Sequence, residues 1–399
     1  MTNKKLNFYF FGDIGEYDKY NPAYVCNAKY TPETLYLIAK NDPFTISKSE
    51  IAHSLNVDEL LIEKIIESLE LIKAIEVKGD KYKINFPVFL KEDVIEMENH
   101  IKNIGKKVGN KIIENKDIIH NKISQLSCSK KHPYERILYH VICDMIFDGT
   151  AFKFFGEKDI FAVSKMQPDN RDYIIVAYED CELVESHSNR LLCSSNNYRS
   201  ENFTFNSFGD SNGFRKDMFR YFRLIQKSVD NASEFKEVNI AYNKVLDDFN
   251  RVIAEECGTL ICNILNNKVI YDELSEKEKK LIKFLCEFGY IDIKNGCMTI
   301  KEPIFYESEI STIVNELSDI MLISIFPIVK EIFHEFESSV ANITPLRHKV
   351  DIRETANEVW HQIFGSINEY LVKEGFVARP DCIEGEGRYL RSIIIREDK

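Results

Sequence analysis

The sequence predicts an α+β fold, mainly helical, in which tandem duplicated units of long helices and small β-hairpins form an intrachain pseudo-dimer. Two observations lead to this prediction. Apolar residues recur at helical spacing through much of the 399-residue chain. In addition, residues 75–89 and 291–305 both read as a strand, a turn, a second strand and a Pro-apolar-Phe ending.

The second observation extends beyond the two hairpins. At a fixed offset of 216 positions, Ile75 meets Ile291, Pro87 meets Pro303 and Phe89 meets Phe305, and the match continues into the following helices. Further on, the best match shifts to an offset of 218, where 171–180 faces 389–398. At this second offset 141–147 faces 359–365. A repeat of this length predicts duplication of one unit, near 25–180 and 245–399, with the two copies packed against each other.

This repeat divides the chain into six parts. Two copies of a helix-and-hairpin module are each followed by a body of helices and strands, and the stretch between them has no counterpart. The parts are an N-terminal segment (1–30), the first module (31–90), its body (91–180), an insert or linker (181–245), a degenerate second module (246–306) and its body (307–399).

The first module is the best defined. Thr31-Pro32 starts a helix, because proline is favoured in the first turn. A second helix covers 47–55, with Ser47 or Ser49 as its N-cap, and a third covers 57–71. The hairpin over 75–89 follows directly, with Gly79-Asp80 as its turn.

This order of elements, over SKSEIAHSLNVDELLIEKIIESLELIKAIEV, resembles the winged helix-turn-helix modules of bacterial transcriptional regulators. The resemblance covers about residues 31–90 and implies binding to double-stranded DNA, with the second helix of the motif in the major groove and wing lysines at the phosphate backbone. The residues that would contact DNA are Ser47, Lys48, Ser49, His53, Asn56, Lys64, Lys78, Lys81 and Lys83.

The charge of the module leaves an alternative open. Residues 47–71 contain two lysines but six carboxylates, which oppose a phosphate backbone unless they point away from it. The same module could instead dock on another protein, as a non-DNA adaptor. If the carboxylates point away from the lysines of the wing, DNA binding is favoured; if they share one face, the adaptor is favoured.

Three other regions bear on this choice. The second wing keeps only Lys294 and Lys301, so we expect the second copy to preserve packing rather than DNA reading. Residues 102–131 carry eight lysines against two carboxylates, which suits either a phosphate-following surface or a solvated helix face. In the insert, Phe203, Phe205 and Phe208 indicate a strand, most simply one that belongs to a core.

Composition and motifs set further expectations. The net charge of −12 argues against indiscriminate coating of nucleic acid. We expect a cytoplasmic protein with no membrane segment, because the start has no signal-peptide pattern and the richest apolar run, 320–329, is short. The ten cysteines form no CxxC pair and suit a reducing compartment.

We expect no enzyme activity and no cofactor. The sequence has no Walker loop, GxGxxG, GxSxG or HExxH motif. His140 and Asp144 would share one helix face, but a structural histidine is the simpler interpretation, so no metal site is predicted. We also expect a small-molecule or peptide effector, and a chain that is either a monomeric pseudo-dimer or a homodimer.

Overall fold

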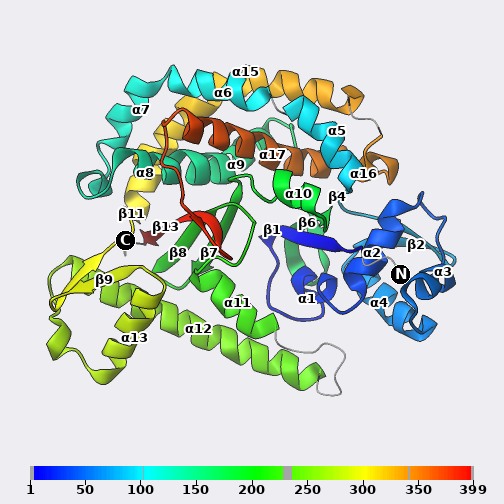
Figure 1. The fold of residues 1–399 in the computed structure, drawn as a ribbon, viewed down its shortest axis with the longest axis horizontal. Coiled ribbons are helices and arrows are strands. Elements are labelled where there is room, and N and C mark those ends of the chain that lie inside the picture. The colour runs from blue at the N-terminus through cyan, green and yellow to red at the C-terminus, as the bar shows by residue number, and fades with distance from the viewer. Residues whose placement is uncertain (1–3, 102, 228–235, 340–341, 397–399) are drawn as a thin grey trace.

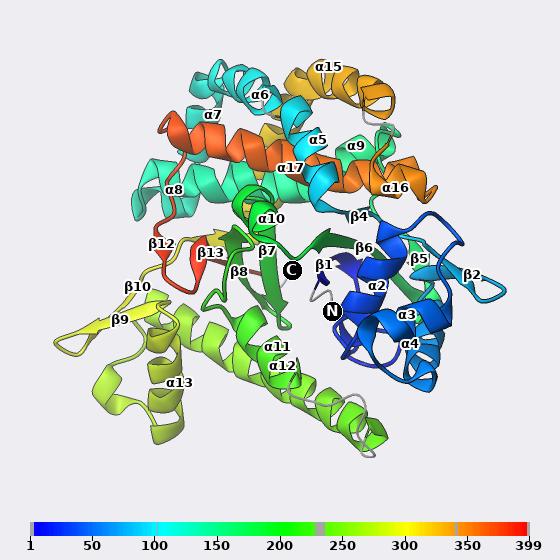
Figure 2. The same ribbon diagram turned by 45° about the vertical axis from the view of Figure 1, so that its right-hand side comes forward.

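A computed structural model describes residues 4–101, 103–227, 236–339 and 342–396, and its fold is α+β and mostly helical. A layer of long helices lies on one side of two small sheets, and two helix-and-hairpin modules lie on the other side, well separated from each other (Figures 1 and 2). Three clusters of buried apolar side chains match this division: one in the helical layer and one in each module.

The first sheet is built around β6 (Arg171–Glu179). β1 (Leu6–Asp13) pairs antiparallel with one edge of β6, and β4 (Val88–Phe89) pairs parallel with the other. A short strand, β5 (Met166–Gln167), also pairs with β6. Because alternate residues of a strand face opposite sides, Ile174 and Val176 enter the helical layer while Tyr173 and Ile175 enter the core of the first module.

The second sheet repeats this arrangement around β13 (Gly387–Ile395). β8 (Phe203–Gly209) pairs antiparallel with β13, and β11 (Ile304–Tyr306) pairs parallel with it. β7 (Ser194–Arg199) extends the sheet beyond β8, and β12 (Cys382–Ile383) pairs with the start of β13.

The helical layer contains residues from both halves of the chain. The first half contributes α5 (Lys91–Ile101), α6 (Ile104–Ile113), α7 (Lys116–Ile123), the 3-10 turn η1 (Ser127–Lys130), α8 (Tyr134–Leu138), the π-helix η2 (Tyr139–Thr150) and α9 (Ala151–Glu157). The second half contributes α14 (Glu307–Glu309), the π-helical η5 (Ile310–Val314), α15 (Asn315–Ser339), α16 (Thr344–Arg347) and α17 (Ile352–Lys373).

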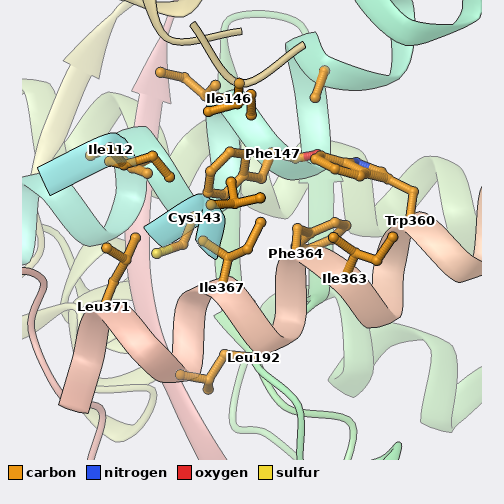
Figure 3. Packing of buried hydrophobic residues seen from close by; sticks show 14 of the residues in the cluster. Ile112, Cys143, Ile146, Phe147, Leu192, Trp360, Ile363, Phe364, Ile367 and Leu371 are labelled. Carbon is orange, nitrogen blue, oxygen red and sulfur yellow. The ribbon is translucent and has the colours of Figure 1, made fainter. Parts of the chain in front are cut away.

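One apolar core joins these helices. Trp360 of α17 is fully buried, packs against Phe155, and donates its indole N–H to the carbonyl of Phe147 in η2 (Figure 3). Trp360 thus lies between helices of the two halves of the chain. α6 crosses α17 closely because Gly105 and Gly109 have no side chains; a Cβ at either position would lie within 2.5 Å of Ser366 or Tyr370.

The segment Glu307–Phe336 in this layer is long and apolar enough to cross a membrane by length and composition, and an 18-residue window of it has a mean hydropathy of 1.6. The run 320–329 is shorter than this apolar segment, because further apolar residues lie on both sides of the run. In the fold, Leu317, Met321 and Ile325 of this segment are fully buried in the shared core.

Module 1, residues 31–90, has the predicted order of elements. It contains α2 (Thr31–Lys40), α3 (Lys48–Leu55), α4 (Glu59–Leu71) and the hairpin β2 (Ile75–Lys78) with β3 (Lys81–Ile84). Ser47 is the N-cap of α3 and forms a capping box with Glu50, which confirms one of the two predicted caps. Asn56 makes the turn before α4 in the left-handed conformation, φ 55°.

Module 2, residues 246–306, contains most of α12 (Lys236–Leu265), the short turn η4 (Tyr271–Glu273), α13 (Glu276–Glu287) and the hairpin β9 (Ile291–Lys294) with β10 (Cys297–Ile300). Ser275 caps α13, again with a capping box. At an offset of 216 positions the long helix α12 covers the place of α2, and the place of α3 falls on the end of α12 and the loop that leads to η4. α12 runs from module 2 towards module 1, where Ile240 enters the core (Figure 2).

The regions expected to flank the modules are integral to the sheets. The N-terminal segment 1–30 supplies β1 and α1 (Pro22–Cys26). Residues 181–245, expected to be an insert or linker, supply α10 (Glu182–His187), β7, β8, α11 (Met218–Lys227) and the start of α12. Phe203 and Phe205 lie in the core of module 2 and Phe208 in the helical layer, so this stretch is not a linker but part of the second sheet.

The offset between matching elements stays at 216. The hairpins, the helical stretches beginning at Lys91 and Glu307, and the strands β6 and β13 all start 216 positions apart. The parallel pairs agree: Phe89 lies opposite Tyr178, and Phe305 lies opposite Ile394. The shift to an offset of 218 inferred from sequence is therefore wrong. A shift of two residues is hard to detect in a strand, because it leaves apolar and polar residues on the same faces as before.

Candidate functional site

The predicted DNA-contact residues lie on one side of module 1, on α3, α4 and the hairpin. An isolated bridge between Ser47 and Lys81 joins the start of α3 to β3. The structure thus places these residues in the same module, but they differ in exposure and in whether a carboxylate of the protein already pairs with them.

Three of the five predicted lysines are paired with carboxylates of the same surface. The Lys48 Nζ lies 3.2 Å from Glu63, the Lys81 Nζ 3.1 Å from Glu50, and the Lys83 Nζ 2.7 Å from Glu76. Lys81 also donates to the carbonyl of Thr45, and Lys83 is 8% exposed. A phosphate would have to displace these carboxylates before it could meet the lysines.

The capping box also removes Ser47 from the contact set. Its hydroxyl and its backbone N–H both donate to Glu50, and the serine is buried. These hydrogen bonds, with the ion pair to Lys81, lower the pKa of Glu50 to about 2. Glu50 therefore stays charged at neutral pH, in the middle of the surface that would face a phosphate backbone.

The remaining predicted residues are exposed. Ser49, His53 and Asn56 lie at the surface of α3 and of the turn that follows it. Lys64 and Lys78 have no carboxylate within ion-pair distance among the described residues, and Lys78 lies 6.0 Å above the ring of Phe44. Lys64 and Lys78 are therefore the two predicted cations that a phosphate could reach without displacing a carboxylate.

The outer face of α4 is acidic and partly apolar. Glu59, Glu63 and Glu67 follow one another at four-residue spacing, and all three are exposed. Leu60, in the first turn of α4, is 66% exposed, and Leu71 at its other end is also exposed. The first turn is where a recognition helix would read base edges, so carboxylates and a leucine occupy the expected reading position.

The lysines of the basic stretch 102–131 fall into two groups. Lys107 pairs with Glu331 and Lys122 with Glu316, both on α15, and Lys111 pairs with Glu114. Lys102 lies outside the described residues. Both interpretations of this stretch stay open, because the remaining four lysines are exposed and have no carboxylate within ion-pair distance among the described residues: Lys106, Lys116, Lys130 and Lys131.

Module 2 offers a different surface. Its wing lysine Lys294 pairs with Asp292, and Lys277 of α13 pairs with Glu256 of α12. A shallow groove lies among α11, α12 and α13, where an effector with an apolar body could bind. Its lining residues are Tyr221, Phe222, Asn250, Ile253, Lys277, Lys280, Leu281 and Phe284.

A buried polar cluster lies between α17, η2 and β6. The sequence analysis did not predict it. Tyr178 donates its hydroxyl proton to Glu358, and Gln362 donates to both. His361 stacks on Phe11 with ring centroids 4.0 Å apart. Burial raises the pKa of Glu358 to about 7 and lowers the pKa of His361 to about 3.

This cluster fits a packing network rather than a reactive site. Its members are almost fully buried, and the groove beside α13 does not border them. The polar residues at i, i+3 and i+4 around the tryptophan, in NEVWHQ, are the signal that could have revealed it.

Among the described residues, no ion pair joins His140 and Asp144. Asp144 accepts a hydrogen bond from Asn206, and burial raises the pKa of Asp144 to about 7. His140 is fully buried, and burial lowers its pKa well below the usual value. Within the described ranges, no group of three His, Cys, Asp or Glu side chains could hold a metal ion.

Comparison of the chain with protein-family models, with curated proteins and with solved structures gives no significant match. The resemblance of residues 31–90 to a winged helix therefore stays a prediction, and function is argued from the geometry alone.

Proposed function

We propose that this chain is a non-enzymatic adaptor, a tandem duplication of a winged-helix unit whose first module docks on a partner protein. The observation that carries the proposal is the surface of module 1. Its carboxylates lie among its lysines rather than away from them, and Leu60 is exposed where a DNA-reading side chain would be expected.

The constant offset of 216 supports duplication. A second feature supports duplication: in each half, a carboxylate accepts a backbone N–H from the other half. The Thr344 N–H donates to Asp93 at 2.9 Å, and the Ser127 N–H donates to Glu309 at 2.8 Å. Asp93 and Glu309 are themselves 216 positions apart. These reciprocal contacts are typical of a two-fold pseudo-dimer within one chain.

The charge balance of module 1 opposes a phosphate backbone. Residues 31–90 contain seven lysines and no arginine against ten Asp and Glu residues, a net charge of −3. Nonspecific DNA affinity depends on the number of phosphates neutralised by free cations. With three lysines paired to carboxylates, few free cations remain, so this surface suits a basic protein partner better than DNA.

The chemistry of the partner follows from the outer face of α4. Glu59 and Glu67, which pair with no cation among the described residues, would attract lysines or arginines, and Leu60 would receive an apolar side chain. A basic amphipathic helix presents both kinds of group on adjacent faces. We therefore expect the partner segment to be such a helix.

Site-specific photo-crosslinking tests the proposal. A benzoylphenylalanine placed at Leu60 should yield one discrete protein adduct in cells, whereas the same group at Met166, which is 82% exposed in the first sheet, should not. The substitution Glu67→Lys in the Leu60-labelled chain should reduce the adduct several-fold. Equal adduct patterns from both positions, or no adduct from position 60, would overturn the proposal.

One observation favours a second candidate, a DNA-binding transcriptional regulator with an effector in the groove beside α13. Lys64 and Lys78 are exposed, and the described residues place no carboxylate beside either. The test is binding to mixed genomic duplex fragments from 50 to 200 mM salt. If DNA is bound, the double variant Lys64→Ala, Lys78→Ala should lower the salt slope by about two, whereas Lys81→Ala should change it less. The adaptor proposal expects no retarded complex.

A further inference from the structure

The outward face of α12 carries a row of exposed apolar side chains. Val238, Tyr242, Val245, Phe249 and Val252 are 64, 59, 51, 64 and 55% exposed, respectively. The opposite face of the same helix is buried against the protein, through Asn243, Asn250 and Ala254. The row is thus not the core-facing stripe of an amphipathic helix but a second apolar stripe that the described chain leaves uncovered.

The spacing of this row is that of a coiled-coil seam. Successive members are four, three, four and three residues apart, which is the alternation of a and d positions in a heptad repeat. A stripe that meets a globular core is usually broader. A strict a/d row instead matches one partner helix, whose side chains fit between the side chains of the row on α12.

α12 is held in place to present this seam. Ile240 is buried in the core of module 1, and Lys244 pairs with Glu16 in the segment after β1. The other end of the helix is fixed in module 2, where Cys257 and Ile261 are fully buried. Because both ends are anchored, pairing through the seam does not require the helix to become ordered first.

The size of the seam suits a symmetric dimer. Five such side chains at these exposures present roughly 600 Å² per copy, so two copies would bury roughly 1,200 Å², the lower end of specific interfaces. Exposed apolar patches of this size on a monomer commonly mark an interaction surface. A peptide bound to one chain would cover the seam of that chain alone. A second copy of the chain, which carries the same seam, covers both seams at once.

We propose that α12 pairs antiparallel with α12 of a second copy of this chain. Around a two-fold axis between Asn243 and Lys244, Tyr242 lies opposite Val245 of the second copy, and Phe249 lies opposite Val238 of the second copy. Each aromatic ring then meets a valine, the large-to-small complementarity that packs well. A parallel pair would instead place ring against ring and valine against valine. The flanking Asp248 lies beside Ala241 of the second copy, so no like charges meet.

The dimer is tested by sedimentation equilibrium of the full chain. The expected mass is twice the 46.5 kDa of one chain. Tyr242→Glu and Phe249→Glu, separately, should each raise the dissociation constant at least about 100-fold, because each buries a charge within the interface. Ile118→Glu, at an exposed position of α7, is the matched control and should leave the dimer intact.

Far-UV circular dichroism confirms that each variant is folded, and Val245→Lys provides a further variant of the seam. A monomeric wild-type chain at all concentrations, or a dimer unaffected by the seam variants, would overturn the proposal. In a background with exposed Cys297 and Cys382 replaced by serine, a chain with Phe249→Cys should crosslink to one with Val238→Cys. Crosslinking of Phe249→Cys to itself would overturn the antiparallel arrangement.

Discussion

Module 1 and module 2 share an order of elements but are attached to the helical layer by different chemistry. His348, in the loop after α16, accepts the N–H of Ile84 at its Nδ1 and donates from Nε2 to the carbonyl of Ala39. Arg347 beside it donates to the carbonyls of Ala39 and Lys40 at the end of α2. Module 1 is thus held by a neutral imidazole and by the guanidinium of Arg347, which binds these carbonyls and lies 3.4 Å from the carboxylate of Asp42.

Module 2 is held by charge. Glu302, between β10 and β11, is 3% exposed and pairs with Arg136 of the first half and Arg391 of β13. The equivalent position in module 1 is Phe86, which is buried in the apolar core. Two modules with the same strand pairing are thus attached to the helical layer by different side chains.

The largest expected effect comes from matched cavities in the two modules. Leu69 and Leu285 are 216 positions apart and both fully buried. Leu69→Ala and Leu285→Ala should each lower the free energy of unfolding by about 3 kcal/mol, through lost burial and an unfilled cavity. Denaturant unfolding followed by circular dichroism measures the loss, and hydrogen exchange shows whether each effect stays within its module. If either variant lowered hydrogen-exchange protection equally in both modules, the two modules would not be attached to the helical layer independently of each other.

Removal of the carboxylate that holds module 2 should have the next largest effect. Glu302→Ala leaves Arg136 and Arg391 partly buried without their partner, which should cost about 2 to 3 kcal/mol. The loss should appear in the hydrogen-exchange protection of β9, β10 and β11. The control is Glu307→Ala, an exposed carboxylate in the same segment, which should stay within about 0.5 kcal/mol of wild type.

Removal of the imidazole that holds module 1 should cost less. His348→Ala leaves the Ile84 N–H unpaired and removes one of the two donors to the Ala39 carbonyl, which keeps its hydrogen bond from Arg347, at a cost of about 1 to 2 kcal/mol. The loss of protection should fall on α2 and β3. His132→Ala is the matched control, because His132 occupies the equivalent position 216 residues earlier and is more exposed. A larger effect from His132 than from His348 would contradict the asymmetry.

The sequence predicts one part of this comparison and not the other. The caps at Ser47 and Ser275, the hairpins and the apolar periodicity depend on residues within a few positions of one another, so they can be read locally. The pairing of β1 with β6, and the hydrogen bond between Ile84 and His348, join residues more than 150 positions apart. No local pattern specifies such partners.

The same limit applies to the candidate site. Sequence alone could place Lys81 and Lys83 on a wing, but not their carboxylate partners, because the Glu50–Lys81 pair depends on how α3 packs against β3. The heptad row on α12 could have been found from spacing, but its exposure could not. A row of apolar residues at helical spacing is usually a core face, and only the packing of α12 shows that its core face lies elsewhere.

The smallest expected effect separates the two attachments by pH. Burial lowers the pKa of His348 to about 4, and the nearby charges of Arg347 and Lys83 act in the same direction. Between pH 6.5 and 4 the unfolded chain therefore binds a proton at this site that the folded chain does not. The stability that this group contributes is present above about pH 6.5 and is lost as the pH falls towards 4, by about 1 kcal/mol at pH 5.5.

His348→Gln should remove this dependence, because glutamine has no proton to gain. Denaturant unfolding at pH 7.0 and pH 5.5, taken as the difference between wild type and variant, isolates the contribution of His348 from all other titrating groups. The difference should shrink on acidification, and hydrogen exchange should place the change in module 1, where the protonated imidazole can no longer accept the Ile84 N–H. A difference that is constant with pH would mean that His348 is equally well accommodated when charged, and the two modules would then be attached by chemistry of the same kind.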